Sequence, residues 1–521
     1  MSGSIRDLSK EPPPAGLTCE VLVIGSGPGG ATAARVLAEA GREVVVLEEG
    51  GDRTGTDLTQ RDGAMYDQLY MDRGGRVTED LSVSVLQGRA LGGGGVINVS
   101  DVVPIPDGVL RHWQKKHGLS DFSPETLAPF KAKALEDLSA NRIPEAALNE
   151  ANRRLRAGAE KLGKRGEVML HNRVGCAGLG TCLLGCPLNA KRNPRFVSIP
   201  KAMDKGARFF LRARALRIHD FRSEVKRISV ATLDEHGYHT KGNFDIRARV
   251  VIVAANAIGS AELLLRSEIG TQHVGKHLTL QPQLPITALF DERIRAFDGI
   301  PQAYAVTEFE KDDDPEHGLW GFRIEAVMGT PGNVASLLPL VGRAGKELMA
   351  NYDRIAASLL LVPDGPSGTV RLGASAGHPI VFYRQAENHK ARLREAIKEA
   401  ARIYFAAGAR RVLVPTIPPL LFDSEADIGK ADSLPFAPAT APLISAHQQG
   451  SVRFAGSPDQ GGADPDGQVF GTRGVYVFDS SGFPSSASSH TMTPILTVAH
   501  YLSAKLAQDQ SAFSTKPASS S

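Results

Sequence analysis

The sequence is poor in several residue types, and each scarcity excludes a class of protein. It has only 4 cysteines in 521 residues, too few for a disulfide-stapled secreted scaffold. Its 60 basic and 57 acidic residues nearly balance, with a net charge of +3, so no nucleic-acid partner is indicated. No run of about 18 apolar residues occurs, so we expect no membrane-spanning helix. The N-terminal stretch lacks a signal-peptide core and a twin arginine, and we expect a cytoplasmic protein.

A glycine-rich turn near the N-terminus predicts a dinucleotide-binding fold. Residues 21–48 read as strand, turn, helix, strand and acid, and the turn is Gly25-Ser26-Gly27-Pro28-Gly29-Gly30. Gly25 and Gly27 let the backbone pass close to a pyrophosphate, Gly30 lets the helix pack closely on the strand, and the helix N-terminus offers free N–H donors. Glu48 follows Gly30 by 18 residues (48 − 30), where its carboxylate can accept both ribose hydroxyls. The alternative is a plain turn in an ordinary α/β protein.

The middle of the chain changes to a strand pattern. Between about 276 and 385 the apolar runs LPITALF, LWGFRIEAVM, IAASLLLV, GTVRLG and PIVFY are separated by turn signals, which predicts an antiparallel sheet that could floor a substrate cavity. A long amphipathic helix is expected over 388–407, and residues 443–506 return to the strand and helix pattern of the cofactor domain.

Four separated motifs resemble the glucose–methanol–choline (GMC) oxidoreductase family. They are the N-terminal glycine turn with Glu48, the run GRALGGGGVIN at 88–98, the run AANAIGS at 254–260, and the C-terminal segments SAHQQG at 445–450, VYVFD at 475–479 and SHTMTP at 489–494. They span nearly the whole chain in the family's order. The resemblance implies FAD rather than NAD, and it departs from the family pattern at Asn256, where glycine is usual.

The expected fold class is α/β, with a discontinuous Rossmann-type FAD-binding domain and an α+β substrate domain on an antiparallel sheet. We place the FAD-binding domain at 18–110, 195–275 and 440–507, and the substrate domain at 276–439. A helical and cysteine-rich segment occupies 111–194, and 1–17 and 508–521 are expected to be flexible tails.

The resemblance also implies further contacts to the cofactor: Arg89, Gly92, Gly93, Asn98, Ala254, Ala255 and Asp479. Three of them have an alternative, purely structural role: Arg89 could form a surface salt bridge, Asn98 could form a turn and Asp479 could cap a helix. Ile97 occupies the position at which some family members carry a histidine that attaches FAD covalently, so we expect non-covalent FAD.

Two histidines are the candidate catalytic groups. Oxidation of an alcohol by a flavin moves a hydride to the ring nitrogen N5, and a base must take the hydroxyl proton; a neutral histidine suits that task. The family places two polar groups over the flavin, and His447 and His490 match their positions. Either could be the base, with the other orienting the hydroxyl. We therefore expect oxidation of an alcohol to an aldehyde or ketone.

Three of the cysteines lie close together in the segment 175–187. Cys176, Cys182 and Cys186 have the spacing C-x5-C-x3-C-P, and three thiolates on a glycine-rich loop could ligate an iron–sulfur cluster. Sugar dehydrogenases of the family carry a 3Fe–4S cluster on a similar run and pass electrons to a cytochrome, whereas its long-chain alcohol oxidases have a similar GCP segment. Free or structural thiols and a disulfide are the alternatives.

These observations leave several functions open. The leading one is oxidation of a bulky or lipophilic alcohol, with oxygen or an electron-acceptor protein as the partner. A sugar or polyol dehydrogenase with a 3Fe–4S cluster and a cytochrome partner is the second. A non-redox flavin-dependent lyase or decarboxylase and a non-catalytic flavin-binding scaffold are the others, and the presence of both histidines argues against the scaffold.

Overall fold

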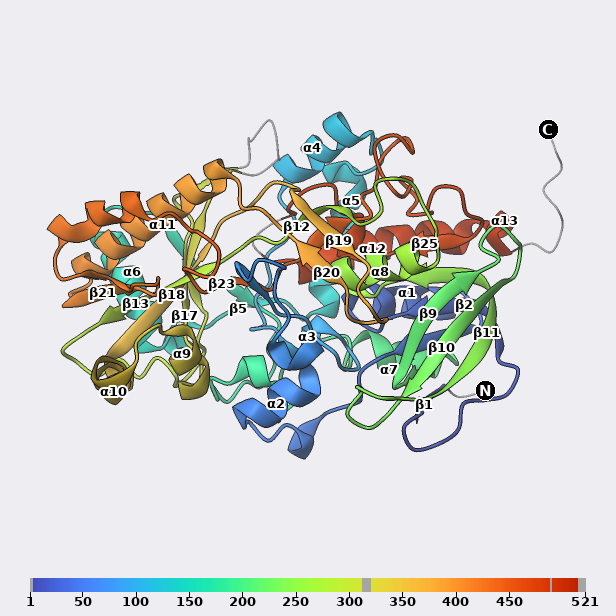
Figure 1. The fold of residues 1–521 in the computed structure, drawn as a ribbon, viewed down its shortest axis with the longest axis horizontal. Coiled ribbons are helices and arrows are strands. Elements are labelled where there is room, and N and C mark those ends of the chain that lie inside the picture. Colours follow the sequence, from blue (N-terminus) through green and yellow to red (C-terminus); the bar gives the residue numbers. More distant parts are fainter. Residues whose placement is uncertain (1–2, 312–319, 488–489, 514–521) are drawn as a thin grey trace.

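Two large sheets occupy opposite ends of the long axis of the molecule (Figure 1). The computed structural model describes residues 3–311, 320–487 and 490–513. Within this part of the chain, no helix has the length and apolarity needed to cross a membrane. The sequence prediction of an α/β fold with a Rossmann-type domain and an antiparallel substrate sheet is confirmed.

The first sheet is mostly parallel and follows directly from the apolar runs around the glycine turn. Its strands pair in the order β1 (Ser4–Asp7), β8 (Arg208–Leu211), β3 (Val44–Glu48), β2 (Thr18–Ile24), β11 (Thr240–Val253), β10 (Lys226–Leu233) and β9 (Ala213–His219), with β25 (Val475–Val477) also pairing with β11. Only the β11–β10 and β10–β9 pairs are antiparallel. The core strands β2 and β3 are largely buried: helix α1 packs against both of them, and strand β9 also contacts β3.

The helices α1 (Pro28–Glu39), α7 (Ser198–Asp204) and α12 (Met492–Gln508) pack together on this sheet, and α5 (Pro124–Asp137) lies against α12. Thus a helix from the far C-terminus rests on the first helix of the chain. His490 lies just before α12, so it is carried on the segment that leads into this helix. The remaining helices near this sheet are α2 (Asp62–Leu69), α3 (Gly94–Ile97), α4 (Asp107–His117) and α8 (Asn256–Arg266).

The second sheet has seven strands, and each pair of neighbouring strands is antiparallel. Their order is β22 (Leu420–Phe422), β21 (Arg411–Val414), β13 (Leu284–Leu289), β18 (Ile355–Leu361), β17 (Arg323–Val327), β14 (Tyr304–Val306) and β6 (Gly166–Val168). Helices α11 (Glu387–Ala406) and α6 (Glu150–Lys161) cover one face. Near the other face lie the short helices α9 (Pro331–Leu337) and α10 (Gly342–Ala350).

The expectation of one continuous antiparallel sheet over 276–385 is only partly right. The runs GTVRLG and PIVFY form β19 (Gly368–Arg371) and β20 (Ile380–Phe382), which belong to a separate four-stranded sheet with β12 (Lys276–Thr279) and β24 (Gln449–Ser451). Alternation of apolar residues predicts a strand but not its partner, which explains the difference. Short two-stranded pairs complete the structure: β4 (Val83–Val85) with β23 (Leu443–Ser445), β5 (Asn141–Arg142) with β7 (Leu170–His171), and β15 (Glu310–Lys311) with β16 (Trp320–Gly321).

The expectation of flexible tails needs correction at both ends. Strand β1 adds a parallel edge strand to β8, and Leu8 just after it is buried. At the other end, α12 runs to Gln508 and a short helix α13 (Gln510–Phe513) follows, with the Arg42 guanidinium 3.7 Å from the centre of the Phe513 ring. Apolar burial and sheet pairing order these residues. Residues 514–521 lie outside the described part.

Candidate active site

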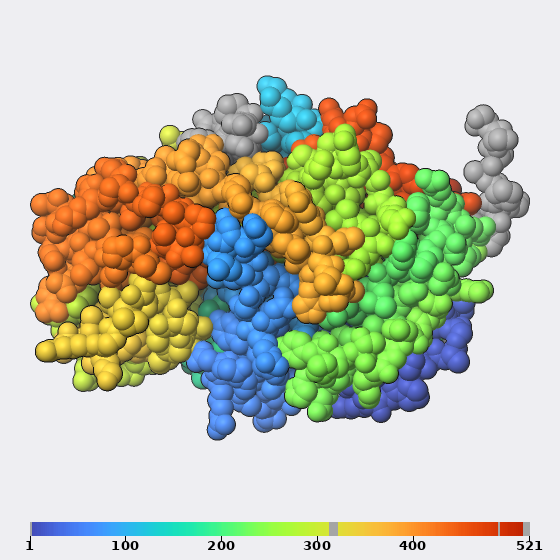
Figure 2. All heavy atoms as spheres, viewed as in Figure 1, coloured from blue at the N-terminus to red at the C-terminus, as the bar shows by residue number. Residues whose placement is uncertain are grey.

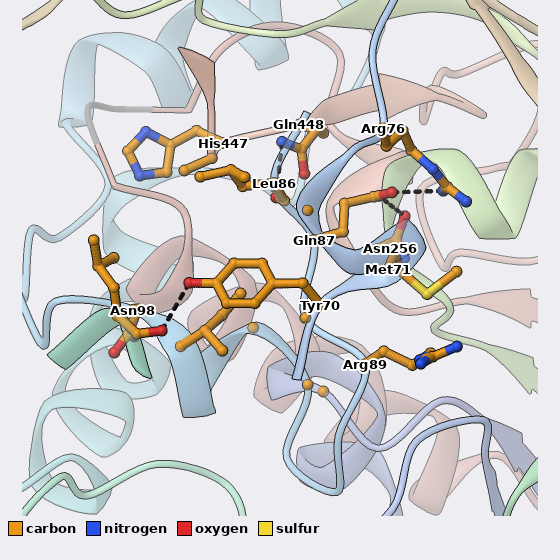
Figure 3. A pocket seen from close by; sticks show the side chains of 18 of the residues that line it. Tyr70, Met71, Arg76, Leu86, Gln87, Arg89, Asn98, Asn256, His447 and Gln448 are labelled. Atoms are coloured by element: carbon orange, nitrogen blue, oxygen red, sulfur yellow. Dashed lines mark hydrogen bonds between the residues drawn. The ribbon is translucent and has the colours of Figure 1, made fainter. Parts of the chain in front are cut away.

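A cavity of about 840 Å³ lies between the two sheets. The carboxyl ends of β2, β3 and β11 open into one end of it, and β13, β17 and β18 line the other. The carboxyl edge of a parallel sheet is the usual ligand site of doubly wound folds. Figure 3 shows part of this cavity, with His447 and Gln448 above Tyr70 and Asn98 in the view.

The glycine turn forms a cradle at the parallel-sheet end of the cavity. Gly25, with φ +103°, lies against Ala254, and a Cβ atom on it would come within 2.3 Å of the Ala254 carbonyl oxygen. A Cβ on Gly93, with φ +57°, would lie 2.6 Å from the Cα of Gly27. Gly27 directly precedes α1, so free helix N–H groups face the cavity. Backbone, rather than side chains, therefore forms the wall where a pyrophosphate would lie.

Gly30 and Gly92 do not line the cavity, but they hold the cradle together. A Cβ on Gly30 would lie 2.0 Å from the Gly25 carbonyl oxygen, which is the close helix–strand packing expected from the motif. The Gly92 N–H donates to the Ser26 hydroxyl at 3.1 Å. Pro28, Ala254 and Ala255 line the cavity beside them.

Glu48 ends β3 at the cavity wall, as the motif spacing predicted. Its carboxylate accepts hydrogen bonds from the Ser26 N–H at 3.0 Å, the Ser26 hydroxyl at 2.6 Å and the Gly50 N–H at 2.7 Å. Burial raises the pKa of Glu48, although these hydrogen bonds oppose the rise. The side chain is thus fixed at the position where a ribose would be bound.

The predicted contacts Arg89, Asn98 and Asp479 all line the cavity. Arg89 and Asp479 also form hydrogen bonds within the protein. The Arg89 guanidinium donates to the carbonyl oxygens of Gly237, His236 and Asp67. It therefore braces the cavity wall, and its place near the phosphates of a cofactor stays a prediction. Asp479 accepts a hydrogen bond from the Ser481 N–H at 2.8 Å, so it caps the short helix 480–482. This is the structural alternative named for it above.

Asn98 follows α3 and holds the loop after it. Its side-chain oxygen accepts from the Ser100 N–H at 3.1 Å, which is the turn-forming role, and its amide nitrogen lies 3.1 Å from the Met492 sulfur. Asn256, in contrast, occupies the usual glycine position with φ +67° and accepts a 2.5 Å hydrogen bond from Gln87, whose oxygen in turn accepts from Arg76 (Figure 3). Asparagine tolerates this left-handed conformation better than most residues do.

The two candidate catalytic histidines meet in the cavity although they come from separate segments. Their ring centroids are 5.0 Å apart and the rings are nearly perpendicular, at 76°. His447 follows β23 and His490 precedes α12. Each side chain is almost fully buried, at 8% and 7% exposure for the residue.

The surroundings give the two imidazoles opposite charge preferences. Burial lowers the pKa of His447 far below its ordinary value, and the nearby charge of His490 lowers it further. Burial also opposes charge on His490, but the Glu325 carboxylate, 2.9 Å from its Nε2, outweighs that effect and raises its pKa. The surroundings therefore favour the neutral imidazole at His447 and the imidazolium at His490.

Comparisons with known proteins agree with this geometry. Two family models described as GMC oxidoreductase match residues 66–283 and 364–499, and a model of an NAD(P)-binding Rossmann-like domain matches 23–85. A GMC-type oxidoreductase of Mycobacterium tuberculosis is 32% identical over 496 residues, covering 93% of this chain and 75% of that protein. The chain belongs to the GMC oxidoreductase family.

Other proteins resemble this GMC oxidoreductase over nearly its whole length. It is 28% identical to a long-chain-alcohol oxidase of Arabidopsis thaliana, over 94% of this chain and 67% of that protein. The crystal structure of pyridoxine 4-oxidase from Mesorbium loti shares its fold with a TM-score of 0.69 at 15% identity, covering 94% of this chain and 99% of that one. Formate oxidase from Aspergillus oryzae has a TM-score of 0.70 at 14% identity, covering 96% and 100%.

The family's cofactor is FAD, and the residues present fit it. The side-chain-free contact between Gly27 and Gly93 leaves room for a diphosphate, and Glu48 is fixed where a ribose would lie. The histidine pair lines the same cavity. The glycine turn, Glu48, Ala254 and Ala255 would hold the cofactor.

Several site residues were missed from the sequence. Glu325 lies in the middle of an apolar strand run, and that isolated acid was an available signal. It is fully buried and receives a 2.5 Å ion pair from Arg323. Asp101, three residues after Asn98, has a fully buried carboxyl 4.0 Å from His490, and neither of its oxygens has a hydrogen-bond partner in the described structure. Burial, the largest effect, raises the pKa of Asp101.

Beyond the histidines, the cavity follows one face of the antiparallel sheet. Its lining residues on β13, β18 and β17 form two cross-strand rows: Pro285 and Leu359, then Thr287, Ala357 and Val327. Glu325 is opposite Leu359 in the first row, but it does not line the cavity. Ile355 and the α9 segment, with Val334, Leu337 and Leu338, line the far end. Apart from Thr287, this face of the sheet is apolar, whereas the cavity is polar at the start of β13, where Gln283 bonds His447.

The rim of the far end joins the two halves of the molecule. The Tyr66 hydroxyl on α2 donates to the Asn333 side-chain oxygen on α9 at 2.8 Å, and both residues line the cavity. In Figure 2 the yellow surface of this part of the chain borders the blue surface around α2 across a recess. The apolar part of the cavity therefore ends beneath α9.

The three clustered cysteines lie apart from this cavity. Cys176, Cys182 and Cys186 line a separate space of about 30 Å³. All are free thiols, and so is the buried Cys19, so the disulfide alternative is not seen. Lys191, buried next to them, donates to the carbonyl oxygens of Val96, Asn98 and Cys182. The cysteine loop is thus tied directly to the loop that carries Asn98.

Proposed function

We propose that this GMC oxidoreductase oxidises a lipophilic alcohol, with non-covalently bound FAD, to the corresponding aldehyde or ketone. The polarity of the cavity is the observation that supports this substrate class. A hydroxyl would lie between the two histidines, and an apolar chain would lie along the rows that contain Leu359, Ala357 and Val327. The similarity to a long-chain-alcohol oxidase agrees with the same class. Ile97, buried at the end of α3, offers no nucleophile for a covalent link to the cofactor.

The two imidazoles divide the work. FAD, when bound, supplies the hydride acceptor. Neutral His447 takes the hydroxyl proton on Nε2, because its Nδ1 faces the side chains of Gln281 and Gln283 at hydrogen-bond distance. Imidazolium His490, held by Glu325, places positive charge beside the substrate oxygen and stabilises negative charge that develops there. The apolar walls exclude water from the reacting end, which strengthens both interactions.

Anaerobic mixing of the FAD-loaded protein with a panel of alcohols tests the proposal. Primary alcohols with long alkyl chains should bleach the oxidised-flavin absorbance and yield the aldehyde in equal amount. Bleaching only by sugars or polyols would contradict the substrate class. Product formed without bleaching would indicate the lyase or decarboxylase alternative. Repeating turnover in air, with peroxide measured, distinguishes oxygen as the acceptor from a separate electron-acceptor protein.

The cysteine loop supports a second candidate, a dehydrogenase with an iron–sulfur cluster. Three free thiols line one small space beside the Asn98 loop, and three thiolates can ligate a 3Fe–4S cluster. Protein purified without oxygen would then contain about three irons and lose them in Cys182→Ser. Iron-free protein with full activity toward alcohols would remove this candidate and leave the thiols with a structural role.

A further inference from the structure

Two glutamines make competing hydrogen bonds to the same nitrogen of His447. Its Nδ1 lies 2.8 Å from the Oε1 atom of Gln281 and 2.7 Å from the Nε2 atom of Gln283. All three residues are buried. In a neutral imidazole a ring nitrogen either carries the proton and donates, or carries the lone pair and accepts. Nδ1 therefore cannot satisfy both glutamines at once.

Each glutamine favours a different tautomer of the ring. Donation from Nδ1 to Gln281 leaves the lone pair on Nε2, which has no protein partner in the described part of the chain. That form can accept a proton from a substrate. Acceptance from Gln283 instead places the proton on Nε2, and that form cannot act as a base. The choice between the two hydrogen bonds thus decides whether His447 can take the hydroxyl proton.

The backbone holds Gln281 more firmly than a loop residue would normally be held. Gln281 has φ +48°, in the left-handed region. The buried Asp364 carboxylate accepts from the Gln281 N–H at 2.9 Å, from the Leu280 N–H at 3.0 Å and from the Tyr383 hydroxyl at 2.9 Å. This buried acceptor, on a different segment, sustains a conformation that would otherwise be strained. It directs the Gln281 side chain at His447.

Gln283 is placed differently. Its backbone pairs with Ile444, just before His447, and its side chain lines the cavity. Its amide can therefore turn toward a cavity ligand when Nδ1 bonds Gln281. We propose that Gln281 is a positioning residue that selects the base form of His447, and that Gln283 opposes it. This inference rests on the proposed function, in which His447 is the base.

Paired substitutions test the inference, because Gln281→Leu and Gln283→Leu remove one amide each with similar change in size. With a long-chain alcohol, Gln281→Leu should slow flavin reduction about 10²-fold with little change in substrate affinity. Gln283→Leu removes the competing amide instead, so it should slow reduction much less than Gln281→Leu does. Gln281→Glu keeps an acceptor and adds negative charge, so reduction should be retained and its acid limb should move to higher pH, since the pKa of His447 rises. Equal slowing in both leucine variants, with unchanged pH limbs, would overturn the proposal.

A direct measurement of the tautomer separates this inference from the proposed function. In FAD-loaded protein with ¹⁵N-labelled histidine, the His447 signals, identified by their loss in His447→Asn, should show the proton on Nδ1. In Gln281→Leu they should show it on Nε2. Wild-type protein with the proton on Nε2 would refute the inference even if alcohols reduce the flavin. If the tautomers behave as expected but no alcohol reduces the flavin, the proposed function alone fails.

Discussion

The chain length of the substrate should control the rate, and Ala357 is the residue that tests this. Ala357 lies in the second cross-strand row, between Thr287 and Val327, and lines the cavity. Each methylene group buried there contributes about 0.8 kcal/mol, equivalent to about a fourfold increase in kcat/KM. From a four-carbon to a ten-carbon primary alcohol, six added methylene groups should therefore raise kcat/KM by as much as about 4 × 10³-fold, and the rise should level off when the apolar end is full.

Ala357→Phe should remove most of that increase. The aromatic side chain would occupy the space of the substrate chain beyond the first row, so long alcohols should lose their advantage while short ones keep their rates. Ala335→Phe is the matched control, because Ala335 is exposed on α9 and does not line the cavity. Steady-state kcat/KM for a series of primary alcohols, on protein with equal FAD content, gives the comparison. A flat dependence on chain length in the wild type, or an unaltered one in Ala357→Phe, would refute the assignment of the apolar end.

Two further substitutions probe the charged and the cofactor ends of the cavity. In Glu325→Gln, burial should lower the pKa of His490, so the basic limb of flavin reduction should move to lower pH and the rate at neutral pH should fall about 10²–10³-fold. The free energy of unfolding should fall by about 3–5 kcal/mol. The loss should be largest between about pH 4.3 and 6.5, because in that range Glu is ionised and His is protonated even in the unfolded chain. An equal loss at all pH values would contradict a stabilising contribution from this ion pair. Gly93→Ala should abolish FAD retention while leaving a folded protein, because a Cβ would meet the Gly27 backbone at 2.6 Å and φ is +57°; normal flavin content after gel filtration would contradict the cradle.

Local patterns in the sequence were enough to predict the dinucleotide fold. The glycine turn, the apolar strands beside it and the spacing to Glu48 depend on backbone conformation and on residues close in the chain. The same is true of α11, expected at 388–407 and observed at Glu387–Ala406. The histidines could be named because family motifs surround them. In contrast, the pairing of β19 and β20 with β12 and β24 depends on contacts between distant segments, and alternating apolar residues do not specify those partners.

The charges and proton positions at the site were decided by the tertiary structure. Nothing near His490 in the chain indicates that Glu325, which is 165 residues away, keeps it charged, or that Gln281 and Gln283 compete for His447. The sequence predicted that Arg89 lies near the phosphates or in a surface salt bridge, whereas the structure shows its guanidinium donating to carbonyl groups of a distant hairpin. The cofactor motif and the identity of the candidate histidines could therefore be predicted from residues close together in the sequence. The protonation of each group depends on burial and on partners from elsewhere in the chain, because electrostatic interactions act through space rather than along the sequence.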